Sequence, residues 1–289
     1  MIRRRRTTSS TRPPSTSATR SRVEFVPRST AATRTRSSLD SPAVATWARE
    51  RRQGLAQVAL FVAAVQVYEA LRRVLDPDWA AAVENARRIG ELERLAGFGV
   101  ERGLQRAFLE APHLVQVLNV FYLAGHFAFT GAFFIWLYRA SPGRFRLFRD
   151  GLLVTTALAL VVHWVFPTAP PRLAGVGLVD TLRLHTGIDI GSSAASDYYN
   201  PVAAVPSLHA AYAVGVGVGV ALVAGSLAAR ALGLAYPFAV VLAIVVTGNH
   251  FFLDAAAGVV TLGAGFLLAG WYNRRQRRGV EQSGSSPGS

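Results

Sequence analysis

Long apolar runs alternate with short polar segments through the middle of the chain, between two polar ends. A helix needs roughly 20 mostly apolar residues to cross a bilayer, and backbone groups in lipid must be hydrogen-bonded within their own segment. The pattern therefore predicts an all-α, polytopic membrane bundle. Its six transmembrane helices are expected at residues 55–75, 114–138, 151–166, 208–227, 232–249 and 253–272.

Residues 78–111 show a different pattern, in which apolar residues recur among charged ones such as Arg87, Glu93 and Arg106. This spacing is typical of amphipathic helices, which we expect to lie on the membrane surface. A soluble helical hairpin is the alternative. With this segment included, residues 53–273 are predicted to form one membrane domain.

Both ends of the chain are polar and basic. Residues 1–52 contain 13 arginines and three acidic residues, and residues 274–289 contain four arginines and one glutamate. Such segments cannot bury enough apolar surface to fold, so two disordered tails are predicted. The net charge of +14 lies mostly in these tails, which favours contact with lipid head groups over nucleic-acid binding.

The arginine distribution also predicts the orientation. With both termini in the cytoplasm, 22 arginines are cytoplasmic and nine are outside, as the positive-inside rule requires. We therefore expect a multi-pass protein of the plasma (inner) membrane with two cytoplasmic tails. The chain has no cysteine, which excludes disulfides and thiolate metal sites.

Three short motifs then fall together on the extracytoplasmic side. They read Phe-Pro-Thr-Ala-Pro-Pro-Arg at 166–172, Ala-Val-Pro-Ser-Leu-His at 204–209 and Gly-Asn-His-Phe-Phe-Leu-Asp at 248–254. His250 and Asp254 are four residues apart, so on a helix they share a face. The carboxylate can then fix the imidazole tautomer and leave the other nitrogen as a nucleophile or base. A structural His–Asp pair that locks two helices is the alternative.

The other two motifs offer a proton donor and a cation. His209 is expected in the first turn of a helix, where free N–H groups can hold a phosphate and the imidazole can protonate a leaving oxygen. Arg172 follows the rigid Pro170–Pro171 pair, and its guanidinium can clamp two phosphoryl oxygens. A plain surface histidine and a snorkelling interfacial arginine are the alternatives.

Taken together, these motifs resemble the phosphatidic acid phosphatase type 2 superfamily. Its usual pattern has a Lys/Arg motif, then Pro-Ser-Gly-His, then Ser-Arg with a downstream His and an Asp four residues later. Here Leu208 stands where glycine is usual, and no Ser-Arg precedes His250. In these details, and in Asn200-Pro201 upstream, the chain resembles the inositol phosphorylceramide synthase-like branch.

The resemblance implies an extracytoplasmic lipid phosphatase or phosphotransferase that needs no metal and no cofactor. It assigns His250 as the nucleophile, Asp254 as its orienting partner and His209 as the general acid and then base. Arg172 and the Ser207 turn would hold the phosphoryl oxygens of a lipid phosphate or phospholipid. The lysine and the third-motif arginine of the usual clamp are missing, and Arg183 or Arg106 are candidates to replace them.

Further polar residues are expected to line a lipid pocket: His126, Asn249, Tyr199 and Asn200, with Asn119 and Tyr198 nearby. His163 is expected to cap or join helices. Hydrolysis and transfer to an alcohol acceptor remain open, since both begin with the same step. The alternative function is a proton-coupled transporter that uses the intramembrane His and Asp residues as a relay. Against it stand the absence of an internal repeat and the position of these residues at helix ends.

Overall fold

The computed structural model describes residues 78–187 and 202–284, together with separate helical positions between 53 and 70. The chain divides into two compact units, Met1–Gln57 and Val58–Ser289, and all elements below belong to the second. The predicted helix at 55–75 falls largely on residues outside those described, as does the tail at 1–52. Both stay predictions.

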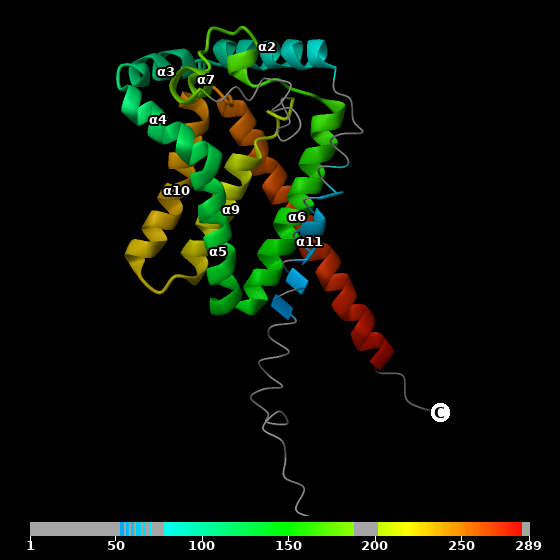
Figure 1. Cartoon of the computed structure of the whole chain (residues 1–289). Coiled ribbons are helices and arrows are strands. Elements are labelled where there is room, and N and C mark those ends of the chain that lie inside the picture. The colour runs from blue at the N-terminus through cyan, green and yellow to red at the C-terminus, as the bar shows by residue number, and fades with distance from the viewer. Residues whose placement is uncertain are drawn as a thin grey trace, which may run out of the picture. The chain divides into compact units, whose positions relative to one another are not determined.

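The bundle consists of helices α5, α6, α9, α10 and α11 with the shorter α4 (Figure 1). Their bounds are α4 Pro112–Val120, the π-helical turn η2 Phe121–Gly125, α5 His126–Ala140, α6 Pro142–Val165, α9 Leu208–Val223, α10 Leu227–Val246 and α11 Phe252–Gly284. Within the described ranges the only β-type pairing is one isolated parallel bridge between Thr168 and Ala203. The predicted all-helical class is confirmed.

Among the described residues, three stretches are long and apolar enough to cross a membrane: Pro112–Ala140, Leu227–Val246 and Phe252–Gln276. α9 is apolar but has 16 residues. α6 has 24 residues, yet its first turns carry Arg144, Arg146 and Arg149, so its apolar part starts only at Gly151. The described helices thus support a membrane protein. They supply three candidate spans, so the predicted number of six is not confirmed.

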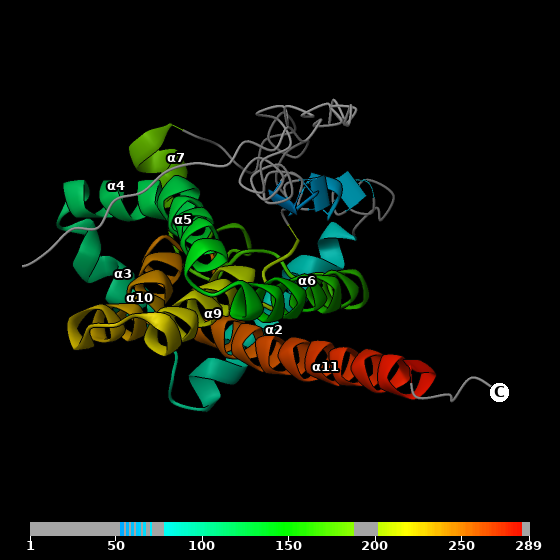
Figure 2. The same ribbon diagram turned by 90° about the horizontal axis from the view of Figure 1, so that it is seen from below.

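Close packing of the bundle depends on small residues. A Cβ atom on Gly217 of α9 would lie 2.5 Å from the carbonyl oxygen of Gly233 on α10, so only glycine permits this approach. α6 and α11 run side by side in two perpendicular views (Figure 1, Figure 2). There Gly265 packs directly against Thr155, and any side chain at 265 would displace α11.

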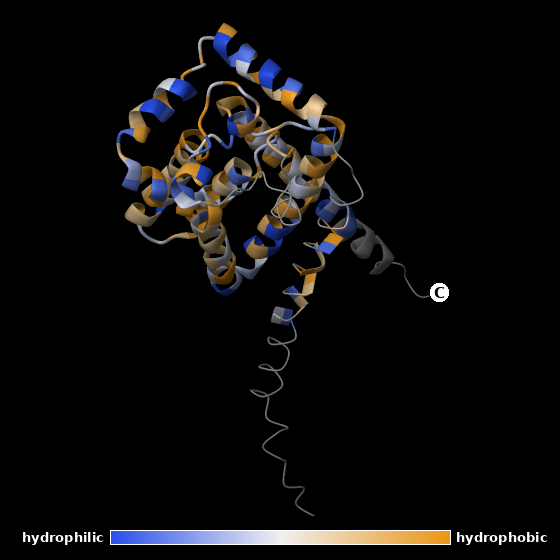
Figure 3. Cartoon of the chain, turned by 45° about the horizontal axis from the view of Figure 1, so that its top comes forward, coloured by the Kyte–Doolittle hydropathy of each residue, from blue (hydrophilic) through white to orange (hydrophobic). Residues whose placement is uncertain are grey.

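The predicted amphipathic segment forms two helices, α2 (Trp79–Leu95) and α3 (Glu101–Leu109). Hydrophilic residues recur along α2 with hydrophobic ones between them (Figure 3). Ala82, Ala86 and Ile89 on its inner face pack in one cluster with Ala169 and Phe251. The helices therefore cover the end of the bundle that carries the motifs, and their place on a membrane surface stays a prediction.

Candidate active site

His250 lies on the connection between α10 and α11, and the backbone of this connection is fixed at Gly248. Gly248 has φ +71°, a left-handed conformation typical of the residue that ends a helix. The N–H groups of Asn249 and His250 both donate to the carbonyl of Ile244, at 2.9 and 3.1 Å. A Cβ on Gly248 would also meet Arg172 Cβ at 3.1 Å. The glycine of this motif is therefore required by both its conformation and its neighbours.

Asp254 holds His250 from the first turn of α11. Its Oδ2 lies 3.3 Å from His250 Nδ1 and accepts a hydrogen bond from the Phe251 N–H at 2.9 Å. Both residues are buried, at 4% and 0% exposure. The expectation that the two share one helix face is wrong in detail, because α11 begins at Phe252 and His250 precedes it. The carboxylate reaches back to the imidazole while it caps the helix.

His209 lies in the first turn of α9, as expected, and faces His250. Ser207 is the N-cap of this helix, and its hydroxyl accepts from the Ala210 N–H at 3.3 Å. The ring centroids of His209 and His250 are 5.9 Å apart. The His209 ring stacks on Tyr122 at 4.6 Å, and its Nε2 is buried with no hydrogen-bond partner among the described residues. A buried nitrogen of this kind is suited to exchange a proton with a bound substrate.

Arg172 is buried on the 3₁₀ turn η3 (Pro171–Leu173), at 6% exposure. Its Nε donates to Asn249 Oδ1 at 3.0 Å, and one terminal nitrogen pairs with Asp180 at 2.8 Å. The guanidinium is therefore oriented by a neighbour of His250 and is not a snorkelling interfacial group. Ser207 is likewise buried, but its hydroxyl is used as a helix cap.

Backbone hydrogen bonds join the three motifs pairwise. Ala204 N–H donates to the Thr168 carbonyl at 3.0 Å, and Arg172 N–H donates to the Gly248 carbonyl at 2.9 Å. Ser207 N–H donates to the Asp254 carbonyl at 3.0 Å. Segments far apart in sequence are thus fixed as one unit, which brings His209, His250, Asp254 and Arg172 together.

The polar residues expected near a lipid pocket each make a defined contact where the structure describes them. His126 begins α5, hydrogen-bonds to the Tyr236 hydroxyl at 2.8 Å and lies 5.1 Å from the His209 ring. Asn119, expected to line the pocket, is instead fully buried and bonded to Thr181. His163 joins α6 to the second motif through the Pro206 carbonyl at 3.3 Å. Tyr198, Tyr199 and Asn200 lie outside the described residues, so their expected roles stay predictions.

Two residues that the sequence analysis did not single out hold this region in place. Asp180, the N-cap of α7 (Thr181–Thr186), pairs with Arg172. Gln105 on α3 is buried and bonds to the Val179 and Val246 carbonyls, at 3.0 and 2.9 Å, and to the Val179 N–H. No spacing rule marks these single polar residues: Asp180 lies eight residues from Arg172 across an irregular turn, and the partners of Gln105 lie 74 and 141 residues away.

The candidate replacements for the missing clamp cations are less well placed. Arg106 is exposed, and its Nε donates to the carbonyl of Arg102 one turn earlier. Arg183 is exposed on α7, where its backbone N–H is bonded to Asp180. The Arg106 contact is directed back along α3, and the Arg183 contact is a backbone one, so a clamp role for either guanidinium stays a prediction.

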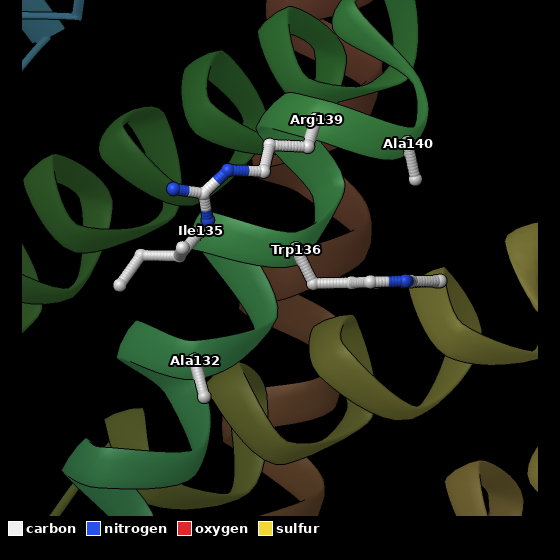
Figure 4. A pocket seen from close by; sticks show the side chains of 5 residues that line it. All are labelled: Ala132, Ile135, Trp136, Arg139 and Ala140. Carbon is white, nitrogen blue, oxygen red and sulfur yellow. The ribbon is translucent and has the colours of Figure 1, made fainter.

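A groove of about 510 Å³ lies away from this site, on the outer surface of α5 (Figure 4). Its lining residues are Ala132, Ile135, Trp136, Arg139 and Ala140. They belong to the half of α5 opposite His126, and none is a nucleophile or general acid. The groove therefore brings no group for nucleophilic or acid–base catalysis from its lining residues.

Comparisons with known proteins agree with the motifs. A sequence profile of the PAP2 superfamily matches residues 87–268, a range that contains Arg172, His209, His250 and Asp254. Neither the comparison with curated proteins nor that with solved structures gives a match. The matched range covers more than half of the chain and all three motifs, and the chain therefore belongs to the PAP2 superfamily.

Proposed function

We propose that this protein is an integral-membrane lipid phosphatase or phosphotransferase that acts through a phosphohistidine on His250. Superfamily membership supports a phosphatase or phosphotransferase type of function. The observation that carries the finer proposal is the backbone linkage of the three motifs, which sets His209 and His250 with ring centroids 5.9 Å apart beside Arg172. A structural His–Asp pair alone requires neither a second histidine nor a buried arginine.

In the first step, His250 Nε2 attacks phosphorus. Asp254 accepts the Nδ1–H hydrogen bond, so the lone pair of the proposed nucleophile is on Nε2. As the N–P bond forms, the P–O bond to the leaving alcohol breaks and protonated His209 gives its proton to that oxygen. Arg172, held by Asn249 and Asp180, offsets the negative charge on the phosphoryl oxygens.

In the second step, neutral His209 takes a proton from water or from an acceptor alcohol. The resulting oxygen attacks phosphorus, the N–P bond breaks and its electron pair returns to His250. Water gives a phosphatase and an alcohol gives a phosphotransferase. The Pro-Ser-Leu-His and Asn-His motifs favour the inositol phosphorylceramide synthase-like branch, and hence transfer of a phospho-head group to a lipid alcohol.

The site is proposed to face the extracytoplasmic side. His209 and His250 lie at the end of the bundle covered by α2 and α3 (Figure 1). Arg139, Arg144 and Arg230 lie at helix ends of the opposite side, which matches a cytoplasmic surface. Positions at helix ends also disfavour the transporter alternative, whose sites are typically at the midplane.

Mass spectrometry tests the proposal directly. Purified protein is incubated with a panel of lipid phosphates and phosphodiesters, with and without a lipid alcohol, and the products are identified by mass. We expect release or transfer of a phosphoryl group, and a phosphate adduct on His250 that is acid-labile. His113→Ala is the matched control, since His113 is exposed on α4. Turnover in the His250→Ala protein equal to this control would exclude His250 as the nucleophile.

A further inference from the structure

Two glutamates from the covering helices are buried directly beside the candidate active site. Glu93 on α2 is 1% exposed and Glu101 on α3 is 4% exposed. Glu93 Oε1 accepts a hydrogen bond from the Leu253 N–H at 2.6 Å, in the first turn of α11. Asp254, the partner of His250, is the next residue in the chain. The position of Glu93 is thus coupled to the helix start that places Asp254.

Two carboxyl groups that are buried close together repel each other when both are ionised, so one of them is expected to keep its proton. Glu93 Oε2 and Glu101 Oε1 are both buried without a hydrogen-bond partner among the described residues, and the two carboxyl groups act on each other electrostatically. Two carboxylates are acceptors only, so these groups can share a hydrogen bond only when one of them is protonated. Burial, a hydrogen bond shared with Glu101 and the negative charges of Glu101 and Asp254 raise the pKa of Glu93 to about 9.

We propose that Glu93 and Glu101 form a proton-sharing carboxyl pair that positions the His250–Asp254 pair by holding the first turn of α11. The proposal assigns a role that the three motifs do not contain. In its catalytic part it rests on the proposed function. Its structural part stands on the burial of both carboxyl groups, their unpartnered oxygens and the hydrogen bond from the Leu253 N–H to Glu93.

No positively charged group among the described residues contributes to the raised pKa of Glu93, so a shared proton is what stabilises the two buried acids. α3 contributes Glu101 itself, and α11 contributes Asp254, which is bonded to His250. From η3 comes Arg172, which pairs with Asp180. On the outer face of α2, Glu84 and Glu91 pair with Arg88 and Arg94 and are exposed.

The sign of the pH dependence follows from the raised pKa. Between about 4.5 and about 9 the folded protein keeps a proton that the unfolded chain has released. The contribution of the pair to stability is complete below about 4.5 and is lost progressively as the pH rises to about 9. Deprotonation also places two negative charges beside Asp254, so the turn that carries it loosens at alkaline pH.

The test compares Glu93→Gln, Glu101→Gln and Glu93→Leu with Glu84→Gln as the matched control on the exposed face of α2. Glutamine keeps an acceptor for the Leu253 N–H and supplies a donor without a titrating proton. Infrared spectroscopy at pH 7 is expected to show a protonated carboxyl band in wild-type and Glu84→Gln protein. This band is expected to disappear in both single glutamine variants at the pair.

Thermal unfolding and turnover give the functional readouts. From pH 5 to pH 9 the melting temperature of the wild type is expected to fall relative to that of Glu93→Gln. With an aryl phosphate, the ratio of wild-type to Glu93→Gln turnover is expected to fall about tenfold per pH unit above about 9. Glu93→Leu is expected to lose kcat at unchanged KM and to exchange the amide hydrogens of residues 251–256 faster.

The outcomes separate the two proposals. An infrared band that survives both glutamine variants, or a turnover ratio that stays flat from pH 7 to pH 10, would overturn the carboxyl pair. If the band and the unfolding results are as expected but the wild type turns over no phosphate ester, the pair stands and the proposed function is wrong.

Discussion

The two histidines are proposed to do different work, and their alanine variants are therefore expected to respond differently to the leaving group. His250→Ala removes the nucleophile, so it should eliminate turnover of any ester. His209→Ala removes only the proton donor and later acceptor. With p-nitrophenol as the leaving group, which departs readily without a proton, the His209→Ala protein is expected to keep measurable activity.

The size of the difference follows from the role of each residue. General acid catalysis is typically worth about 100- to 10,000-fold, or roughly 3–5 kcal/mol of transition-state stabilisation. The His209→Ala protein is expected to lose this full factor with a lipid alcohol as the leaving group. With the aryl ester, the rate of the first step in the His209→Ala protein should fall by only about tenfold or less. Asp254→Asn should lie between the two histidine variants, since the imidazole remains but its tautomer is no longer fixed.

The assay measures burst release of p-nitrophenol from an aryl phosphate, in parallel with release of the alcohol from a lipid phosphate. Folding has to be controlled, because His209 packs on Tyr122 and Asp254 is left without its partner when His250 is removed. Melting temperatures of all variants and of His113→Ala provide that control. A well-folded His250→Ala protein with near-native turnover, or equal losses in His209→Ala for both esters, would refute the division of roles.

Four further results are expected. A single cysteine at Ser196 should be labelled from outside the intact cell. A single cysteine at Ser141 should be labelled only after the cell is permeabilised, and the reverse pattern would show an inverted topology. Removal of residues 1–45 should leave turnover within about twofold by the same aryl ester assay, since their composition does not support a packed core; a tenfold loss at normal membrane insertion would contradict this. Vanadate should inhibit, because it mimics five-coordinate phosphorus, while chelators should leave turnover unchanged; activity lost in chelator and restored by magnesium would contradict the scheme. Gly248→Ala should lower the melting temperature, because a left-handed alanine costs about 1–2 kcal/mol and its Cβ meets Arg172, whereas Gly103→Ala, with open space around it, should not.

Among the described residues, the apolar pattern predicted where the long helices of the bundle lie, but not where they begin and end. α10 starts at Leu227 and not at 232, because Ser226 caps it and the helix continues through Arg230. α6 starts at Pro142, nine residues before the apolar run at Gly151; its Ser141 side chain makes no cap hydrogen bond, and proline at the first position favours the helix start. Hydropathy measures the length that lipid can cover, whereas caps and backbone hydrogen bonds decide the length of the helix.

The sequence indicated which of these residues the structure brings together, but not how they are placed, and their catalytic roles stay predictions. Residue types and short spacing were sufficient to select His209, His250 and Asp254. They were not sufficient to place His250 ahead of α11, since that depends on the left-handed Gly248 and on a carboxylate that reaches back. Asp180 lies eight residues from its partner Arg172 and Gln105 lies 141 residues from Val246, so no local pattern announces either contact.

The way the motifs are linked explains why these segments occur together. Each motif is irregular backbone at the end of membrane helices, where unpaired N–H and C=O groups are costly. The first motif accepts from Ala204 and donates to Gly248, and the second donates to Asp254 of the third. Each segment therefore satisfies the backbone of another, and the same bonds set the spacing between the two histidines. Structural stability and the placement of the proposed catalytic residues thus depend on one set of hydrogen bonds, so loss of any motif is expected to disturb the other two.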